Sequence, residues 1–264
     1  MTTLSVCGNM IKEVLFNGSN YGYYIWKGGV GKSTTSVGLA YALLQRGRRV
    51  LLVDGDAGLR SLDRMLGVDA SLVYDIADVT AGRCEPIRAI YPCPGFNGLF
   101  LLPAPAREQD TVPPEIMKQL IPLIAAYYDH VIIDSPAGVG LGFFSAIAAA
   151  QRALVVTNPD PVCVRDTAIV HRLLTEAGIQ EQRMVINRFQ YGHFRKLGCF
   201  EDLDSMIDES GLRLIAVIPE DFHLTAAAAK SQPVSRRSSG AMAYSRLAAR
   251  LEGERVPLAS LRWL

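Results

Sequence analysis

The sequence predicts an α/β fold in which a doubly wound, mostly parallel sheet is flanked by helices. Several short runs are almost continuously apolar, which is typical of strands buried on both faces. Helical patterns lie between these runs, an alternation that favours parallel strands joined by crossover helices. A glycine-rich stretch precedes the first of these helices, as in folds that bind phosphate groups.

Six runs rich in β-branched and aliphatic residues are the predicted strands. A short aromatic run, "YGYYIW" (21–26), is the only candidate for a first strand, because that strand should end at the glycine-rich stretch. The other six are "RVLLVD" (49–54), "LFLLP" (99–103), "HVIID" (130–134), "ALVVT" (153–157), "RMVIN" (183–187) and "LIAVIP" (214–219).

The predicted helices begin and end at recognisable residues. The segment "KSTTSVGLAYALLQRG" (32–47) opens with small polar residues and closes at Gly47, a suitable C-cap. The segment 113–129 starts with two prolines and has helical spacing, although Pro122 should kink it. Residues 162–178 and 239–252 show the same periodicity.

One large domain can accommodate the whole pattern. We expect a single domain over residues 23–253, preceded by a poorly patterned segment, 1–22, and followed by a C-terminal tail, 254–264. The chain has 264 residues, which one large α/β domain can absorb. The tail carries leucines, a tryptophan and two arginines, so it is a candidate for contact with a membrane.

Composition excludes several classes of function. With 27 basic and 26 acidic residues the net charge is +1, which gives no indication of a specific nucleic-acid partner. The first 20 residues lack a basic start followed by an apolar run, and no stretch is long enough to span a bilayer, so we expect a cytoplasmic or peripherally attached protein. No C-x-x-C pair occurs among the five cysteines, so iron–sulfur and zinc sites lack ligands at the usual spacing: Cys7, Cys84, Cys93, Cys163 and Cys199.

The stretch "GGVGKST" (28–34), here called the phosphate loop, predicts a nucleotide site. Its glycines let successive backbone amides turn toward phosphate oxygens, and the following helix adds the field of its N-terminus. The lysine can reach the β- and γ-phosphates, and the serine hydroxyl can bind Mg²⁺. The predicted binding residues are Gly28, Gly29, Val30, Gly31, Lys32, Ser33 and Thr34.

Three carboxylates follow two of the predicted strands. Asp134 ends "HVIID", and Asp54 and Asp56 end "RVLLVDGD". Open parallel sheets bind ligands at the carboxyl ends of their strands, where carboxylates can hold the Mg²⁺ of a nucleotide. A lone aspartate would more often be a helix cap, but three beside a phosphate loop favour a functional site.

The loop and several later segments resemble the deviant Walker A ATPases of the ParA/MinD family. Lys27 with GGVGKST resembles the loop whose extra lysine marks that family. Seven later segments resemble the septum site-determining MinD branch of the family and follow one another in the order found there. They are "DGDAGLRSLDRMLGV" (54–68), "VYDIADVTAGR" (73–83), "DSPAGVG" (134–140), "TNPDPVCVRD" (157–166), "NRF" (187–189), "VIPED" (217–221) and "KSQPV" (230–234).

The resemblance implies roles for individual residues. Lys27 crosses a dimer interface to the partner's phosphates, and Lys32 holds the phosphates of its own subunit. Asp56 orients the attacking water, with Asp54 assisting near the metal. The metal set is Ser33, Asp134 and Asp54. Asn187 reads the adenine edge, Pro219 borders the base, and Arg188 belongs to the same binding set.

The resemblance also implies a cellular function. ATP with Mg²⁺ drives homodimerisation and attachment to the inner face of the cell membrane, where the dimer recruits a MinC-type division inhibitor. A MinE-type or other topological regulator is a further expected partner. Two alternatives stay open: a flagellar-number or chromosome-partitioning ATPase of the same family, and a scaffold that binds nucleotide without hydrolysing it.

Three departures from the family pattern lie close to the site. Trp26 stands in place of the leading glycine of the loop. If that position needs a positive φ, tryptophan there is strained by roughly 1–3 kcal/mol and nucleotide binding is weakened. Ser61 replaces a usual asparagine and Gly140 a common acidic residue, which affects the expected dimer contacts.

Overall fold

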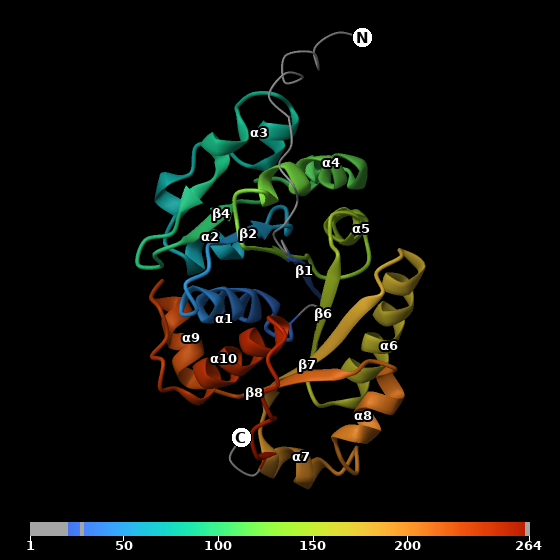
Figure 1. The fold of residues 1–264 in the computed structure, drawn as a ribbon. Helices are drawn as coiled ribbons and strands as arrows, with labels where there is room; N and C mark the ends of the chain where they lie inside the picture. Colours follow the sequence, from blue (N-terminus) through green and yellow to red (C-terminus); the bar gives the residue numbers. More distant parts are fainter. Residues whose placement is uncertain (1–20, 27–28, 262–264) are drawn as a thin grey trace.

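The computed structural model describes residues 21–26 and 29–261 of the chain, and its strands form one sheet (Figure 1). The strand order is β3-β4-β2-β5-β1-β6-β7-β8, and every neighbouring pair is parallel except β3 with β4. The strands are β1 (Tyr21–Trp26), β2 (Val50–Asp54), β3 (Tyr91–Pro92), β4 (Leu99–Leu102), β5 (His130–Asp134), β6 (Arg152–Thr157), β7 (Glu181–Phe189) and β8 (Leu214–Pro219).

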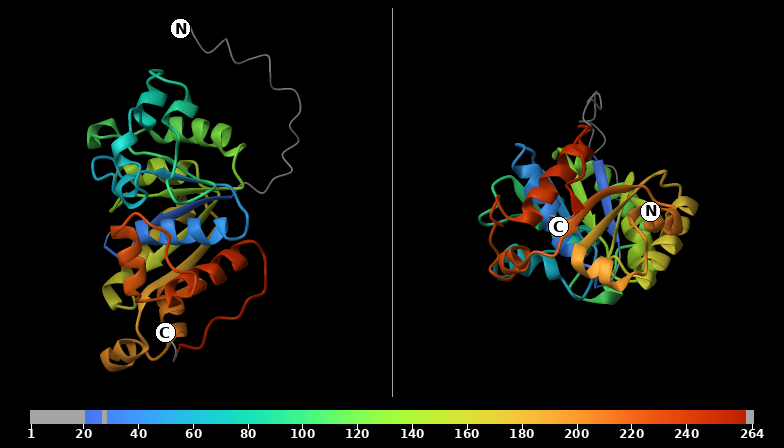
Figure 2. Two further views of the ribbon diagram at one scale, coloured as in Figure 1. Left: turned by 90° about the vertical axis from the view of Figure 1, so that its left-hand side faces the viewer. Right: turned by 90° about the horizontal axis from the view of Figure 1, so that it is seen from below.

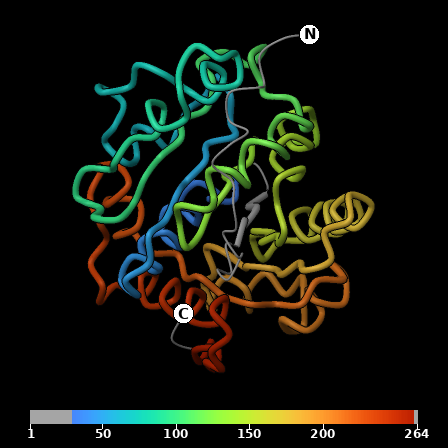
Figure 3. The backbone as a smooth tube through the Cα atoms, turned by 45° about the horizontal axis from the view of Figure 1, so that its top comes forward, coloured from blue at the N-terminus to red at the C-terminus, as the bar shows by residue number. Residues whose placement is uncertain are grey.

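Ten α-helices connect these strands in the described part of the chain. They are α1 (Lys32–Leu44), α2 (Ser61–Met65), α3 (Ile76–Thr80), α4 (Pro114–Ala125), α5 (Leu141–Ala148), α6 (Pro161–Glu176), α7 (Tyr191–Leu197), α8 (Leu203–Ser210), α9 (Phe222–Ala229) and α10 (Ser239–Leu251). Short 3-10 turns occur at Asp69–Ser71, Pro86–Ala89 and Glu108–Asp110. In Figure 3 the cyan and green segments lie in the upper part of the view, and the red segments lie at the bottom, next to the blue segment.

The sheet separates two apolar cores, because successive strand residues point to opposite faces. In β2, Leu51 and Val53 join the core beneath α4, α5, α6 and α8, whereas Val50 and Leu52 join the core beneath α1 and α10. The same alternation continues in β5 and β6. Burial on both faces explains why the strands are nearly continuous apolar runs, and it confirms the predicted doubly wound sheet.

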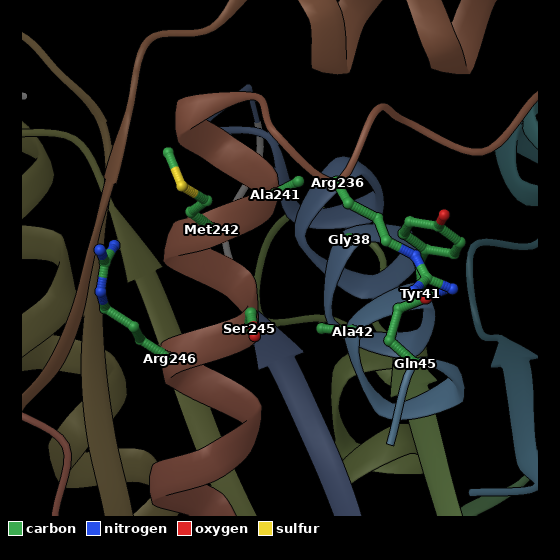
Figure 4. Close-up of a pocket in the computed structure, with 9 residues that line it drawn as sticks. All are labelled: Gly38, Tyr41, Ala42, Gln45, Arg236, Ala241, Met242, Ser245 and Arg246. Atoms are coloured by element: carbon green, nitrogen blue, oxygen red, sulfur yellow. The ribbon is translucent and has the colours of Figure 1, made fainter. Parts of the chain in front are cut away.

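Helices α1 and α10 run side by side on one face of the sheet (Figure 2). Their close approach depends on Gly38, since a Cβ atom there would lie 2.6 Å from Cδ2 of Tyr244. The buried Tyr244 hydroxyl is 3.2 Å from Thr35 Oγ1, one turn into α1. An open groove remains on the outer side, lined by Tyr41 and Gln45 of α1 and by Met242, Ser245 and other residues at α10 (Figure 4).

The start of the C-terminal tail is held against the sheet by one arginine. The Arg250 guanidinium donates to Val256 O at 2.8 Å and to Pro257 O at 2.7 Å. It also donates to Ile215 O in β8 at 2.7 Å. Leu261 packs against the core on the α6–α8 side, while Leu258 stays 45% exposed.

Most predicted elements are confirmed, including the uncertain first strand, which is β1. The sequence did not predict β3, nor six of the helices: α2, α3, α5, α7, α8 and α9. Helix α4 runs on through Pro122 to Ala125. Among residues 21–26 and 29–261, no helix has the length and apolar character needed to cross a bilayer.

Candidate nucleotide site

The predicted site residues gather at the carboxyl ends of the central strands. Strand β1 leads into α1, which connects it to β2 on one side, whereas β6, β7 and β8 extend the sheet on the other. Doubly wound sheets bind ligands at such a reversal of strand order. The phosphate loop lies at this point, between the end of β1 and the start of α1.

The described part of the phosphate loop has the backbone that an anion site needs. Gly29 and Gly31 have φ angles of 73° and 89°, a region that glycine adopts without strain. Gly31 is the N-cap of α1, and no side chain caps the first amides of that helix. Those amides and the helix field are therefore available to a phosphate group. Lys27 and Gly28 lie outside the described residues.

Lys32 is the cation at the centre of the site. Its side chain is 8% exposed, and its charge acts on two carboxylates by lowering the pKa values of Asp56 and Asp134. Burial opposes this effect and is the larger influence, so the pKa values of both carboxylates remain above the ordinary value. A buried ammonium group between carboxylates and backbone amides suits a polyanionic ligand.

Asp54 and Asp134 form a buried pair of carboxylates. They are register partners across β2 and β5, and each residue is 1% exposed. Burial raises the pKa of Asp54 to about 8, and the nearby charge of Asp134 raises it further. Burial likewise raises the pKa of Asp134 to about 6, although Ser33, Lys32 and Ser36 lower it. Two neighbouring buried carboxyl groups do not readily ionise at the same time, and a bound cation stabilises their ionised forms.

The donors around Asp134 fit a Mg²⁺ ion. Ser36 donates to Oδ1 of Asp134 at 3.0 Å, whereas Oδ2 is buried and has no hydrogen-bond partner among the described residues. The Ser33 hydroxyl is close by and accepts from Ser61 Oγ at 3.3 Å. The described chain has no cluster of three or more His, Cys, Asp or Glu side chains suited to a metal. Mg²⁺ does not need one, since it keeps waters and takes its other ligands from phosphates.

Asp56 lies beside this pair at the edge of an open groove. Its backbone amide donates to Asp54 Oδ1 at 2.9 Å, and its side chain is half-buried. Burial raises the pKa of Asp56, Lys32 lowers it, and Glu108 raises it. The groove measures about 380 Å³ and is lined by Asp56, Glu108 and residues of the 136–143 segment. A carboxylate placed here can orient a water molecule next to a phosphate.

A second hollow adjoins the phosphate loop on the α9 side. Its lining includes Gly31, Thr34, Asn187, Arg188 and Pro219, all predicted as nucleotide contacts. Asn187 is 5% exposed, and its Nδ2 donates to Val30 O at 2.7 Å. Arg188 Nη1 donates to Gly29 O at 3.3 Å. The structure thus brings both halves of the predicted site to one edge of the sheet.

The expected strain at Trp26 is wrong. Trp26 is the last residue of β1 and pairs with Val155 of β6, so its backbone is extended. Positive φ among the described non-glycine residues occurs at Arg60, Arg188 and Ser231. The strand continues through the position where the usual motif has glycine, and the described turn lies at residues 29–31.

Sequence reasoning missed Ser36 and Asp221. Ser36 lies one helical turn beyond Lys32 and donates to Asp134, so the spacing within α1 could have identified it. Asp221 follows β8 and accepts from the amides of His223 and Gly240. Burial would raise its pKa, but these hydrogen bonds lower it to about 2. Asp221 thereby joins the starts of α9 and α10 beside the hollow.

Comparison with known proteins agrees with this geometry. Residues 25–234 match the CobQ/CobB/MinD/ParA nucleotide binding domain. The septum site-determining protein MinD of Bacillus subtilis is 37% identical over 237 residues, covering 88% of each chain. MinD in the MinC:MinD cell division protein complex of Aquifex aeolicus superposes with a TM-score of 0.83 at 32% identity, over 91% of this chain and 99% of that one.

A third relative was solved with a ligand. The septum site-determining protein MinD of Pyrococcus horikoshii, complexed with Mg-ADP, has a TM-score of 0.77 at 31% identity, over 89% of this chain and 96% of that one. The matched family domain spans the phosphate loop, the acid pair and the hollow beside Asn187. The chain therefore belongs to the CobQ/CobB/MinD/ParA family of nucleotide-binding proteins, in the branch of the septum site-determining MinD proteins.

Proposed function

We propose that the chain is an ATP-hydrolysing dimerisation switch that acts in the placement of the division site. The observation that carries this proposal is the buried pair Asp54 and Asp134 beside the phosphate loop, where no side chain caps the start of α1, in a chain 37% identical to a MinD protein. The Mg-ADP of the Pyrococcus horikoshii relative supports nucleotide and Mg²⁺ as the ligands.

The chemistry is phosphoryl transfer to water, in which positioning and charge neutralisation do most of the work. Lys32 and the amides of Gly29 to Ser33 hold the phosphates. Asp56 orients the attacking water from the edge of the groove, and Asp54 fixes Asp56 by accepting its amide. Ser33, Asp134 and Asp54 would hold Mg²⁺, which would supply neutralisation of the phosphate charge.

The hollow beside α9 receives the base. Asn187 and Arg188 border it from the end of β7, and the buried Pro219 closes it from β8. Pro219 and Leu224 give the hollow apolar surface and Asn187 gives it a side-chain amide, a combination that suits adenine, whose ring stacks on apolar atoms and whose edge forms hydrogen bonds.

A second copy of the chain covers the site in the ATP-bound state. Lys27 supports this step, because the phosphates of one subunit are already served by Lys32. Large apolar side chains also surround the site without a partner in the described chain: Leu59 (76% exposed), Val139 (46%), Leu141 (55%), Val162 (62%) and Phe222 (78%). They follow β2, β5, β6 and β8, so they share the edge of the sheet that carries the nucleotide site. Apolar residues gathered at one edge are typical of an interaction surface.

The dimer binds a MinC-type division inhibitor, a step supported by the MinC:MinD complex of Aquifex aeolicus. Attachment to the inner face of the membrane occurs through the tail, and a MinE-type or other regulator stimulates turnover. Each tail is short, so two tails in one dimer bind far more strongly than one. Membrane attachment therefore depends on ATP.

Light scattering of the full chain with Mg²⁺ tests the switch. With ATP or a slowly hydrolysed analogue the mass should double, and with ADP it should not. Lys27→Ala should stay monomeric, whereas Asp56→Ala should dimerise without turning over ATP. An unchanged mass with ATP would refute dimerisation, and a dimer without ATP turnover would leave a nucleotide-dependent scaffold.

A further inference from the structure

We infer that Asn187 is a positioning residue that latches the phosphate loop to the base-binding side of the site. This inference rests on the proposed nucleotide binding for its consequence, but the contact itself joins two parts of the protein. Asn187 and Val30 are 157 positions apart in the sequence, and the Nδ2 to O distance is 2.7 Å. Both residues are at least nine-tenths buried, so water competes little for this hydrogen bond.

An irregularity in β7 aims Asn187 at the loop. Register with β8 shifts between Ile186 and Phe189, so β7 carries an extra residue there. Arg188 takes up this extra residue with a φ of 52°, a left-handed conformation that arginine rarely adopts. Bulges beside active sites commonly redirect a side chain in this way. The unfavourable backbone at Arg188 is thus linked to the placement of Asn187.

The loop is shaped to receive the asparagine. A Cβ atom on Gly31 would lie 2.5 Å from Asn187 Nδ2, so the amide occupies the space that any other residue at Gly31 would fill. Arg188 adds a second contact, from Nη1 to Gly29 O at 3.3 Å. The carbonyls of Gly29 and Val30 are therefore both engaged from β7.

The latch also fixes the orientation of the Asn187 side chain. Val30 O can only accept a hydrogen bond, so the atom facing it must be the amide nitrogen. Oδ1 has no hydrogen-bond partner among the described residues and is the atom left for a ligand in the hollow. An acceptor there favours a base with an exocyclic amino group, such as adenine, over one with a carbonyl at the same place, such as hypoxanthine. One side chain thus couples the choice of base to the shape of the phosphate loop.

Hydrogen exchange of the nucleotide-free full chain tests the latch directly. Asn187→Ala should speed exchange of the amides of residues 29–33 by about two- to tenfold, the effect of losing one net hydrogen bond. Asn187→Asp keeps the shape of the side chain but has no hydrogen-bond donor at neutral pH, so it should speed exchange of the same amides. This variant replaces Asn187→Ala if the alanine variant folds poorly.

Gln182→Ala is the matched control. Gln182 is a buried side-chain amide at the other end of β7, where it donates to Thr175 Oγ1 and Ile179 O. Its loss should perturb the strand without changing exchange over residues 29–33. Equal exchange over residues 29–33 in the Asn187 variants and this control would overturn the latch.

Nucleotide affinity separates this inference from the proposed function. Wild-type protein should bind MgATP roughly three- to tenfold more tightly than the inosine analogue MgITP, and Asn187→Ala should lose that preference. Equal affinities in the wild type would overturn the role of Oδ1. If the wild type bound neither nucleotide, the proposed function would fail, while the exchange experiment would still decide whether the latch exists.

Discussion

Replacement of Asp54 by asparagine should make the nucleotide-free protein more stable than the wild type, by a margin that grows as the pH rises. Burial raises the pKa of Asp54 from 3.8 to about 8, so the folded protein holds a proton that the unfolded chain releases. A carboxyl whose pKa is raised on folding costs stability as the pH increases from its unfolded pKa to its folded pKa. The cost grows by about 1.4 kcal/mol per pH unit within that window, or about 4 kcal/mol between pH 5 and pH 9.

Urea denaturation at pH 5 and pH 9 measures this effect. Asp54→Asn keeps an oxygen for the Asp56 amide and has no proton to lose, so its advantage over wild type should be about 4 kcal/mol larger at pH 9 than at pH 5. Asp204→Asn, on the exposed face of α8, is the matched control and should follow the wild type at both values. If wild type and Asp54→Asn changed in parallel with pH, the argument that burial raises the pKa of Asp54 would be refuted.

Three further predictions follow from the fold. Trp26→Gly should leave MgATP affinity unchanged or weaker by calorimetry, because Trp26 continues β1 in pairing with Val155; a tenfold gain would revive the strain argument. Gly38→Ala should lower the free energy of unfolding by about 1–3 kcal/mol, since the added methyl overlaps the Tyr244 ring; an unchanged urea midpoint would contradict that packing. Removal of residues 256–264 should abolish ATP-dependent sedimentation with anionic liposomes while MgATP binding persists; equal sedimentation of the truncated protein would exclude the tail as the anchor.

The core of the fold could be predicted because each strand carries its own signal. The runs at 49–54 and 130–134 are almost continuously apolar because the sheet is covered on both faces, and they correspond to β2 and β5. Strand β3 has only two residues, Tyr91 and Pro92, which is too short for any periodicity to appear. Helices α7 and α8 span 7 and 8 residues, below the length at which an amphipathic pattern is distinct.

The site could be predicted in part because its residues follow strands in a recognisable order. Gly31, Lys32 and Asp134 were placed by their motif and by the strand ends. The contact between Asn187 and Val30 could not be predicted, because it depends on a bulge and on the packing of segments 157 positions apart. The error at Trp26 came from assuming that a motif position requires a turn, whereas the strand extends one residue further.

The hydrogen bonds by which Arg250 holds the start of the tail also affect the solubility of the protein. Strand β8 is the last strand of the sheet, and exposed edge strands offer backbone groups to which a strand of another molecule can add. Arg250 occupies the carbonyl of Ile215 in β8 and brings Val256 and Pro257 alongside it. At the opposite edge, β3 is only two residues long and contains Pro92, which cannot donate to a neighbouring strand. Both edge strands are thereby protected against pairing with another molecule. Protection of β8 depends on the start of the tail, which would leave β8 if the tail inserted into a membrane.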